Sequence, residues 1–307
     1  MISLAGRDIL HGWGKFALTG LGLGLLIGVT LTMGGVYRGM VDDAMVLLDN
    51  SGADLWVVQQ ETLGPYAESS SIFDDTWRSV SGMPGVEEAA NVTYLTTQVR
   101  RGTEDVRAMV VGVDPGMPGS PGQPGYLTAG RHITRSHYEA VADGATGFRP
   151  GDEIRIRRNT YTVVGLTRRM VSSGGDPMIF IPLKDAQEAQ FLKDNDSILQ
   201  QRRRTASNPS LNRPGVPGLL ESVIASQSAN QYVNAVLVRL LPGADPDETA
   251  AHIRRWLRLE VYTRDQMEEI LLGKLIATSS RQIGMFLVIL AVVSAAIVAF
   301  IIYTLTI

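Results

Sequence analysis

Cysteine is absent from the 307 residues of this chain, which excludes both disulfide bonds and thiolate metal sites. Neither sign of charge is in large excess, because the formal net charge is only -3. We expect no broad basic surface on a chain so close to neutral, and this argues against general nucleic-acid binding. The length is sufficient for one or two folded domains.

Sequence patterns of catalysis are missing as well. No G-x-x-x-x-G-K-[ST] loop is present, so the chain cannot hold ATP phosphates in a P-loop, and no G-x-S-x-G elbow is present. His132 and His137 are too loosely placed for a metal pair without a third ligand. We therefore expect a non-enzymatic protein that binds no metal and no cofactor of its own.

Two long apolar runs, Phe16 to Tyr37 and Ile283 to Ile307, contain no Asp, Glu, Lys or Arg. At about 1.5 Å per residue, a helix over either run covers the roughly 30 Å of bilayer hydrocarbon. The first run is too long for a cleaved signal peptide, and no A-x-A site follows it. We predict transmembrane helices at 16–37 and at the end of 264–307, and we expect more sequence to follow Ile307.

Basic residues near the two runs give opposite indications of orientation. Arg7 and Lys15 precede the first run, whereas Lys274 and Arg281 precede the second. The first helix usually dominates, and long translocated domains largely escape the positive-inside rule. We therefore expect a cytoplasmic N-terminus, with residues 39–281 outside the cytoplasm.

Small residues form a stripe in each apolar run. They recur every four residues, at Gly20, Gly24 and Gly28 in the first run and at Ala291, Ala295 and Ala299 in the second. Such stripes let helix backbones approach closely, so we predict that both serve helix packing. The alternative is the ordinary composition of a membrane helix, in which Gly and Ala are common.

The segment before the first run, residues 1–15, alternates apolar and polar positions. This pattern predicts an amphipathic helix in the membrane interface, with Arg7, Trp13 and Lys15 near the lipid headgroups. A frayed terminus is the alternative, because short isolated helices are marginal in water.

Strand and helix patterns alternate between the runs and predict an α+β extracytoplasmic domain. Its expected core is a split β-α-β, porter-like unit interrupted by an inserted, mainly β subdomain. Asp74 is the N-cap candidate of a short helix in the first half, and residues 232–240 are expected to form a strand in the second. Asp245-Pro246 begins a helix well, and Thr263 begins a T-x-x-Q capping box before the last helix. The expected parts are a first half at 38–113, an insertion at 114–230 with a flexible segment at 194–230, a second half at 231–263, and a stalk helix within 264–307.

Both membrane helices are expected to continue into this domain. The apolar spacing of the first run extends beyond Tyr37, and Gly52 is the predicted stop. The last helix is expected to run from Arg264 to Ile307, with Gly273 and Gly284 as its weak points. This geometry would transmit force between the two sides of a membrane.

Several segments resemble one protein family, the MacB/FtsX-type ABC transporter permeases, which include LolC, LolE and DevC-like proteins. The resemblance rests on the order and spacing of these segments across the whole chain. They are GLGLGLLIGVTL, GADLWVVQ, MPGVEEA, AMVVGVDP, FRPGDEIRIRRNTYTVVGL, NAVLVRLLPGAD and EVYTRDQ.

The resemblance implies a permease subunit in the bacterial inner membrane, with four spans and a periplasmic domain between the first two. It also implies a separate ATPase subunit that binds ATP, a second permease copy in a homo- or heterodimer, and often a periplasmic adaptor with an outer-membrane channel. The expected cargo is a lipid, lipoprotein, peptide or drug. The alternative from another class is a two-span membrane sensor with an extracytoplasmic ligand-binding domain.

Overall fold

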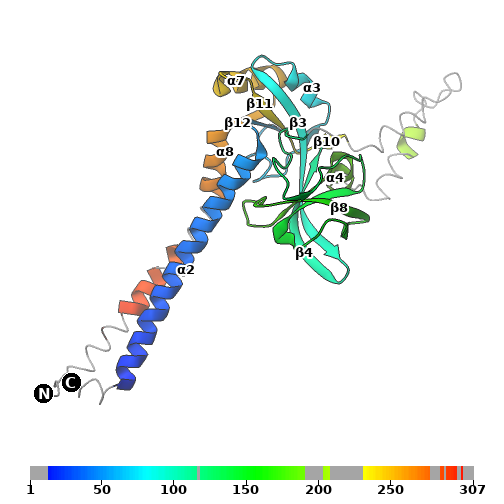
Figure 1. Cartoon of the computed structure of the whole chain (residues 1–307). Coiled ribbons are helices and arrows are strands. Elements are labelled where there is room, and N and C mark those ends of the chain that lie inside the picture. Colours follow the sequence, from blue (N-terminus) through cyan, green and yellow to red (C-terminus); the bar gives the residue numbers. More distant parts are fainter. Residues whose placement is uncertain are drawn as a thin grey trace, which may run out of the picture. The chain divides into compact units, whose positions relative to one another are not determined.

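The computed structural model describes residues 13–115, 118–190, 203–207, 231–276, 284–286, 288–295 and 299 (Figure 1). The chain divides into two units. One comprises Met1–Asp42 with Leu272–Ile307, and the other, here called the globular unit, comprises Asp43–Leu271.

Helix α2 spans Trp13–Ser51 and contains the whole first apolar run. Within it, Gly20–Ser51 is long and apolar enough to cross a membrane, and among the described residues it is the one helix with these properties. The backbone turns at Gly52, which has a φ of +61° that favours glycine. The predicted continuation of this helix beyond Tyr37 and its stop at Gly52 are confirmed.

The last helix differs from the expectation. Helix α8 covers Arg264–Ile270, and the backbone then continues as a π-helix over Leu271–Ile276. The prediction of one uninterrupted α-helix from Arg264 is therefore wrong at Leu271. Gly273 lies in this widened turn. Apart from proline, glycine is the residue that favours the α-helix least. Farther along, Gly284–Ala295 is a shorter apolar helix, and much of the second predicted span lies outside the described residues.

The first lobe of the globular unit is a four-stranded sheet with two helices on one face (Figure 1). Its elements are β1 Leu55–Val58, α3 Thr76–Ser81, β3 Val86–Arg101, β11 Ala235–Leu240, α7 Pro246–Leu257 and β12 Glu260–Thr263. The strand order is β12-β1-β11-β3, with every neighbouring pair antiparallel. Strands from distant parts of the sequence therefore alternate in the sheet, and neither part can form it alone.

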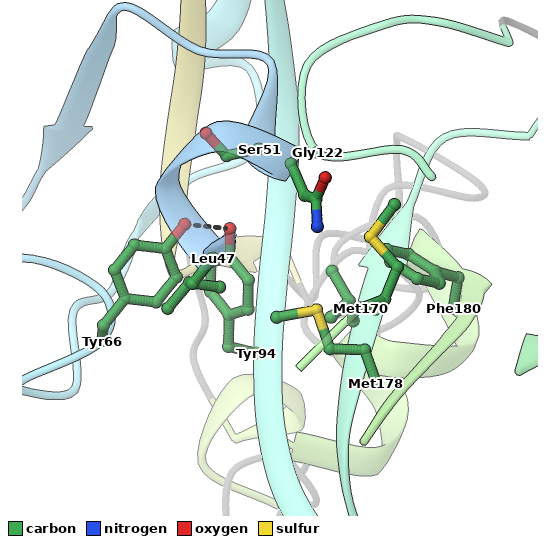
Figure 2. A pocket seen from close by; sticks show the side chains of 10 residues that line it. Leu47, Ser51, Tyr66, Tyr94, Gly122, Met170, Met178 and Phe180 are labelled. Atoms are coloured by element: carbon green, nitrogen blue, oxygen red, sulfur yellow. Dashed lines mark hydrogen bonds between the residues drawn. The ribbon is translucent and has the colours of Figure 1, made fainter. Parts of the chain in front are cut away.

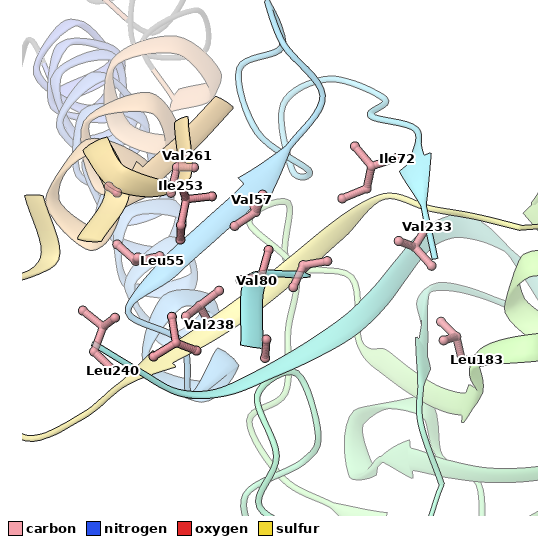
Figure 3. Close-up of a cluster of buried hydrophobic side chains, with 14 residues drawn as sticks. Leu55, Val57, Ile72, Val80, Leu183, Val233, Val238, Leu240, Ile253 and Val261 are labelled. Atoms are coloured by element: carbon pink, nitrogen blue, oxygen red, sulfur yellow. The ribbon is translucent and has the colours of Figure 1, made fainter. Parts of the chain in front are cut away.

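Alternating side chains of this sheet form an apolar core with the two helices (Figure 3). Leu55 and Val57 face Val80 of α3 and Ile253 of α7, and all four are fully buried. Trp56 lies between them in sequence and points to the opposite face, as the two-residue period of a strand requires. Helix α8 contacts β1 of this sheet, and Trp56 is fully buried on the face opposite α3 and α7.

The second lobe extends the same sheet. Its elements are β4 Glu104–Val113, β5 Ala129–Gly130, β6 Glu139–Asp143, β7 Glu153–Ile156, β8 Asn159–Thr167, β9 Met178–Pro182 and α4 Leu183–Gln190. Strand β4 pairs with β9 in parallel, and the long strand β3 also pairs with β7. Val99 and Val110 share the core of this lobe with residues of β6–β9, so segments on both sides of residue 113, where sequence patterns placed a boundary, pack together.

Three local predictions from the sequence have a direct counterpart in the structure. Asp245 caps α7, accepting from the backbone N of Asp247 at 2.9 Å, as expected. At α3 the N-cap position is Asp75, not Asp74, and the Asp75 side chain makes no capping bond. The strand expected at 232–240 is interrupted at Asn234, whose Oδ1 accepts from the backbone N of Tyr94 at 2.8 Å. Most of the expected flexible segment, apart from residues 203–207, lies outside the described residues.

Candidate functional site at the helix ends

One face of the last two turns of α2 is buried in the globular unit. Ala44, Leu47 and Leu48 lie at spacings of three and four residues and are almost fully buried. This spacing places them on one face of the helix. The end of α2 is therefore anchored by packing, in contrast to the exposed residues of the apolar run.

Helix α8 begins next to the end of α2. Arg264 at its first position forms an ion pair with Asp49 of α2. Their side chains are 41% and 59% exposed, so solvent screens the pair and its contribution to stability is small. Met267 of α8 and Leu271, the first residue of the π-helix, are fully buried, and they provide the stronger attachment of this segment.

Loops of the globular unit bond the C-terminal end of α2. The backbone N of Gly122 donates to the carbonyl of Ser51 at 2.7 Å, and Asn50 Nδ2 donates to the carbonyl of Arg169 at 2.9 Å. Ser51 Oγ donates to the carbonyl of Leu48 at 2.7 Å. The last carbonyls of a helix lack intrahelical partners. Here two loops supply bonds at this end, so a displacement of α2 is passed to both.

Gly122 allows its loop to approach the sheet closely. Its φ is +85°, and a Cβ at this position would lie 2.4 Å from Val92 Cγ1 and 3.2 Å from Leu237 Cδ1. Any other residue would therefore collide with the sheet or lift the loop. The close approach brings the Gly122 backbone N within reach of Ser51.

A small cavity lies where α2, the sheet and the second lobe meet (Figure 2). Its volume is about 20 Å³, which is enough for about one water molecule. Flexible Met170 and Met178 lie on one side of it. Methionine fills irregular gaps and repacks easily, so this joint can adapt to small shifts of the helix. The remaining lining residues are Leu47, Asn50, Ser51, Tyr66, Tyr94, Val111, Gly122 and Phe180.

Two tyrosine hydroxyl groups meet at the edge of this cavity (Figure 2). Tyr66 Oη and Tyr94 Oη are 3.2 Å apart, and Trp56 Nε1 donates to Tyr66 Oη at 3.2 Å. Burial raises the pKa of Tyr66 and raises the pKa of Tyr94 well above its ordinary value. Both phenols are therefore neutral, and they act as structural hydrogen-bonding groups.

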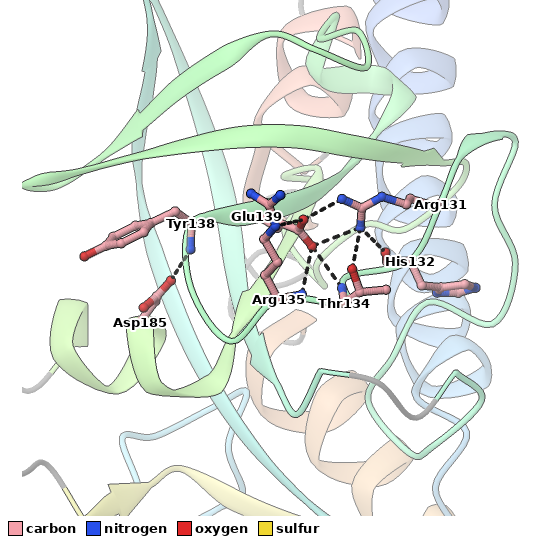
Figure 4. A network of polar contacts seen from close by, with 7 residues as sticks. All are labelled: Arg131, His132, Thr134, Arg135, Tyr138, Glu139 and Asp185. Atoms are coloured by element: carbon pink, nitrogen blue, oxygen red, sulfur yellow. Dashed lines mark hydrogen bonds and ion pairs between the residues drawn. The ribbon is translucent and has the colours of Figure 1, made fainter.

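A charged network holds the loop before β6 in the second lobe (Figure 4). Buried Glu139 accepts from Arg131 Nη2 at 2.5 Å and from the backbone N of Thr134 and of Arg135 at 2.9 and 3.1 Å. The Arg131 hydrogen bonds are the main cause that lowers the pKa of Glu139 to about 2. Every donor lies within eight residues of the acid, so the network serves the conformation of this loop.

The histidines weighed as a metal pair have other surroundings. His137 Nδ1 lies 2.5 Å from Asp185 Oδ1, and Asp185 also accepts from the backbone N of Tyr138 at 2.8 Å. Within the part of the chain that the structure describes, no three His, Cys, Asp or Glu residues form a cluster suited to a metal ion. His132 makes no such contact with His137.

The predicted packing residues are exposed on their helices. A Cβ at Gly20, Gly24 or Gly28 would meet nothing within 4 Å in the described residues. Ala291, Ala295 and Ala299 are also exposed. Packing of the two stripes therefore stays a prediction.

The predicted interface residues are only partly described. Trp13 is 69% exposed at the start of α2. Arg7 lies outside the described residues, as does the side chain of Lys15. The interfacial helix over residues 1–15 is thus a prediction that the described residues do not reach.

Sequence reasoning missed the residues that join the helices to the globular unit. Asp49 and Arg264 are 215 positions apart, and no local pattern connects them. Gly122 lies in a Pro- and Gly-rich segment that predicts only an irregular loop. The capping box at Thr263 was the one useful signal, because it placed Arg264 at the beginning of a helix.

The chain belongs to the MacB-like periplasmic core domain family, whose model matches residues 16–256. It is 26% identical over 194 residues to the uncharacterized ABC transporter permease Rv0072 of Mycobacterium tuberculosis strain H37Rv. It is 24% identical, also over 194 residues, to permease Mb2592 of Mycobacterium bovis. Each match covers 62% of this chain and 53% of the relative, so the chain spans about half the length of the curated relatives it matches.

Two solved extracytoplasmic domains are similar to this chain. The periplasmic region of MacB from Actinobacillus actinomycetemcomitans matches with a TM-score of 0.43 and 10% identity, covering 74% of this chain and 97% of that one. The extracellular domain of the transporter YknZ from Gram-positive bacteria matches with a TM-score of 0.39 and 12% identity, covering 69% and 98%.

Proposed function

We propose that this chain is part of a permease subunit of a MacB/FtsX-type ABC transporter in the bacterial plasma membrane. The N-terminus faces the cytoplasm, and residues 39–281 lie outside it. A separate ATPase subunit binds ATP, and a second permease copy completes the transporter. A periplasmic adaptor and an outer-membrane channel are further partners of the assembly. Membership of the MacB-like family and the names of the relatives support this proposal.

The observation that carries the mechanism is the course of α2. One helix extends from Trp13, before the apolar run, to Ser51, whose carbonyl is bonded by a loop of the globular unit. A helix without an internal break resists bending far better than a loop would. ATP-driven movement of the membrane helices would therefore act on the globular unit through this helix.

Cargo of the expected classes is a lipid, lipoprotein, peptide or drug. Among the described residues, the cavity at the helix ends holds about 20 Å³ and a second one beside Trp77 and Asp114 about 70 Å³, and both are far smaller than the several hundred Å³ of a typical ligand site. This supports a mechanism in which the globular unit pushes cargo or an adaptor and does not enclose it. The comparisons do not favour the two-span sensor, because the relatives are named as permeases.

The test is a flexible Gly-Ser linker inserted after Asn50 in the full permease, assayed with its ATPase partner. Transport should fall strongly, while ATP hydrolysis and membrane insertion persist. The matched control places the same linker at Gly102-Thr103, an exposed turn between β3 and β4. Unchanged transport with the linker after Asn50 would refute transmission through α2.

A further inference from the structure

One face of the second lobe carries an excess of arginine. We use the term arginine face for Arg100, Arg107, Arg155, Arg157 and Arg158, which are all exposed on β3, on β4 or at the β7–β8 hairpin. The alternate side chains of the same strands, such as Val99, Ala108 and Ile156, belong to the buried core. The strands therefore have one apolar and one cationic side.

Strand pairing brings the arginines together. Arg100 of β3 is the register partner of Arg155 of β7, and Gln98 is the partner of Arg107 of β4. Neighbouring strands lie about 4.8 Å apart, and residues two positions apart on one strand are separated by about 6.6 Å. The guanidinium groups are therefore arranged in closely spaced rows.

Internal carboxylates neutralise only part of this charge. Arg100 forms two bonds with Asp105, at 2.7 and 3.1 Å, and Arg107 Nε lies 3.1 Å from Asp176 Oδ2. Within the described residues, the side chains of the other three arginines form no hydrogen bond or ion pair. Glu153 is the remaining exposed acid on β7, so five cations face three carboxylates.

Two local conflicts show that folding alone does not explain this arrangement. Arg157 opens the two-residue turn between β7 and β8 with a φ of +53°, a conformation that favours glycine. Arg100 and Arg155 are like charges directly across from one another, which destabilises a strand pair. A locally unfavourable arrangement that is kept in a folded protein supports a functional role for the residues that form it.

The arginine face begins close to the point where α2 enters the globular unit. Asp176, the partner of Arg107, follows Gly175, and a Cβ at Gly175 would lie 3.4 Å from Asp43 Oδ2. Asp43 is six residues beyond Tyr37, the end of the apolar run. Even a fully extended chain of that length spans only about 22 Å, whatever the orientation of the two units.

Within the globular unit, the rows run in the same direction as α2 followed backwards from Leu47 to Asp43. Leu47 and Val111 line the same cavity, whereas Asp43 and Arg107 are linked through Gly175 and Asp176. Moving from Val111 to Arg107 along β4 therefore follows α2 backwards, from Leu47 to Asp43. The β3–β4 turn lies farther along the same path.

We propose that the arginine face binds the phosphate groups of anionic phospholipids in the membrane that α2 crosses. Guanidinium groups bind phosphate oxygens in a bidentate manner. A packed protein interface usually has aromatic or aliphatic anchors at its centre. No exposed large apolar side chain of the described residues lies on this face, which favours a headgroup surface over an acidic protein. The proposal requires that α2 spans a membrane, and it is independent of transport and of the ATPase.

The experiment uses the full chain in lipid nanodiscs. Because cysteine is absent, Thr103→Cys provides a unique attachment site for a fluorophore at the β3–β4 turn. Energy transfer to a headgroup-labelled lipid is compared between discs of phosphatidylcholine alone and discs that also contain phosphatidylglycerol. Transfer should be higher with phosphatidylglycerol and should decline as salt is raised.

Replacing the three unpaired arginines tests the cause. Arg155→Gln, Arg157→Gln and Arg158→Gln together should reduce the ratio of lipid-bound to lipid-free arginine face about 100-fold, at about fivefold for each charge. The control replaces three arginines on or just after the first-lobe helices, with Arg78→Gln, Arg255→Gln and Arg258→Gln. It should retain the response to anionic lipid. Equal unfolding midpoints will show that both variants fold.

Two results would overturn the proposal. Transfer that does not depend on lipid charge would leave an acidic protein as the partner of the arginine face. An equal loss in the control variant would mean that only net charge matters. Energy transfer is measured without nucleotide, so failure of the transport mechanism would not affect this readout.

Discussion

Gly122→Ala should weaken the attachment of α2 to the globular unit. The added Cβ would lie 2.4 Å from Val92 Cγ1, and both Val92 and Leu237 beneath it are fully buried. Neither side chain can move toward solvent, so the loop must lift. Lifting would stretch the 2.7 Å bond from the Gly122 backbone N to the Ser51 carbonyl.

The expected loss of stability has two parts. A left-handed φ of +85° costs an L-residue about 1–2 kcal/mol, and overpacking a filled core costs about 1–3 kcal/mol. We expect a total of about 3 kcal/mol. Gly119→Ala is the matched control, because its φ is +92° and a Cβ there meets nothing within 4 Å. It should lose only about 1 kcal/mol.

Urea unfolding of the full chain in detergent, followed by tryptophan fluorescence, measures this difference. Trp56 is fully buried beside the joint and reports its exposure to water. Adding Val92→Ala to Gly122→Ala should recover about 1 kcal/mol relative to the sum of the single changes, because the collision is removed. Equal losses for Gly122→Ala and Gly119→Ala would refute the reasoning.

Three further predictions concern stability. Arg157→Gly should raise the free energy of unfolding by about 1 kcal/mol by relieving its left-handed backbone, and a loss in urea unfolding would contradict this. Since the pKa of Glu139 is lowered to about 2, its ion pair stabilises the fold above the ordinary carboxyl pKa and is lost as pH falls toward 2. Glu139→Gln should therefore cost about 2 kcal/mol near neutrality and flatten the stability–pH curve below about pH 4.5, and an unchanged curve would count against the network. Leu48→Ala should lose about 3 kcal/mol, whereas the half-exposed Leu241→Ala should lose under about 0.5 kcal/mol, and similar thermal shifts would contradict burial.

Local signals in the sequence predicted several elements well. The uncharged run and its continued apolar spacing predicted α2, and Gly52 predicted its end, because helix periodicity and glycine conformation act within a few residues. The cap at Asp245 is local for the same reason. The order of segments was enough to indicate the family that the comparisons support.

Other features could not be predicted because they arise from contacts between distant segments. The break in strand 232–240 follows from a bond between Asn234 and Tyr94, which lie 140 positions apart. The extension of β3 into both lobes depends on pairing with β7 and β11, and no propensity encodes a partner. The π-helix that begins at Leu271 was not predicted, because helix propensity does not distinguish an α-helix from a π-helix.

The sequence by itself determined where the chain is apolar enough for a membrane, where helices begin and end, and that an α+β domain lies between the runs. These properties depend on composition and on spacing along the backbone. Only the tertiary structure decided that Ser51, Gly122 and Arg169 share one joint and that arginines from two hairpins form one face. Such groupings depend on strand register and loop closure, which bring residues together irrespective of their distance in the chain.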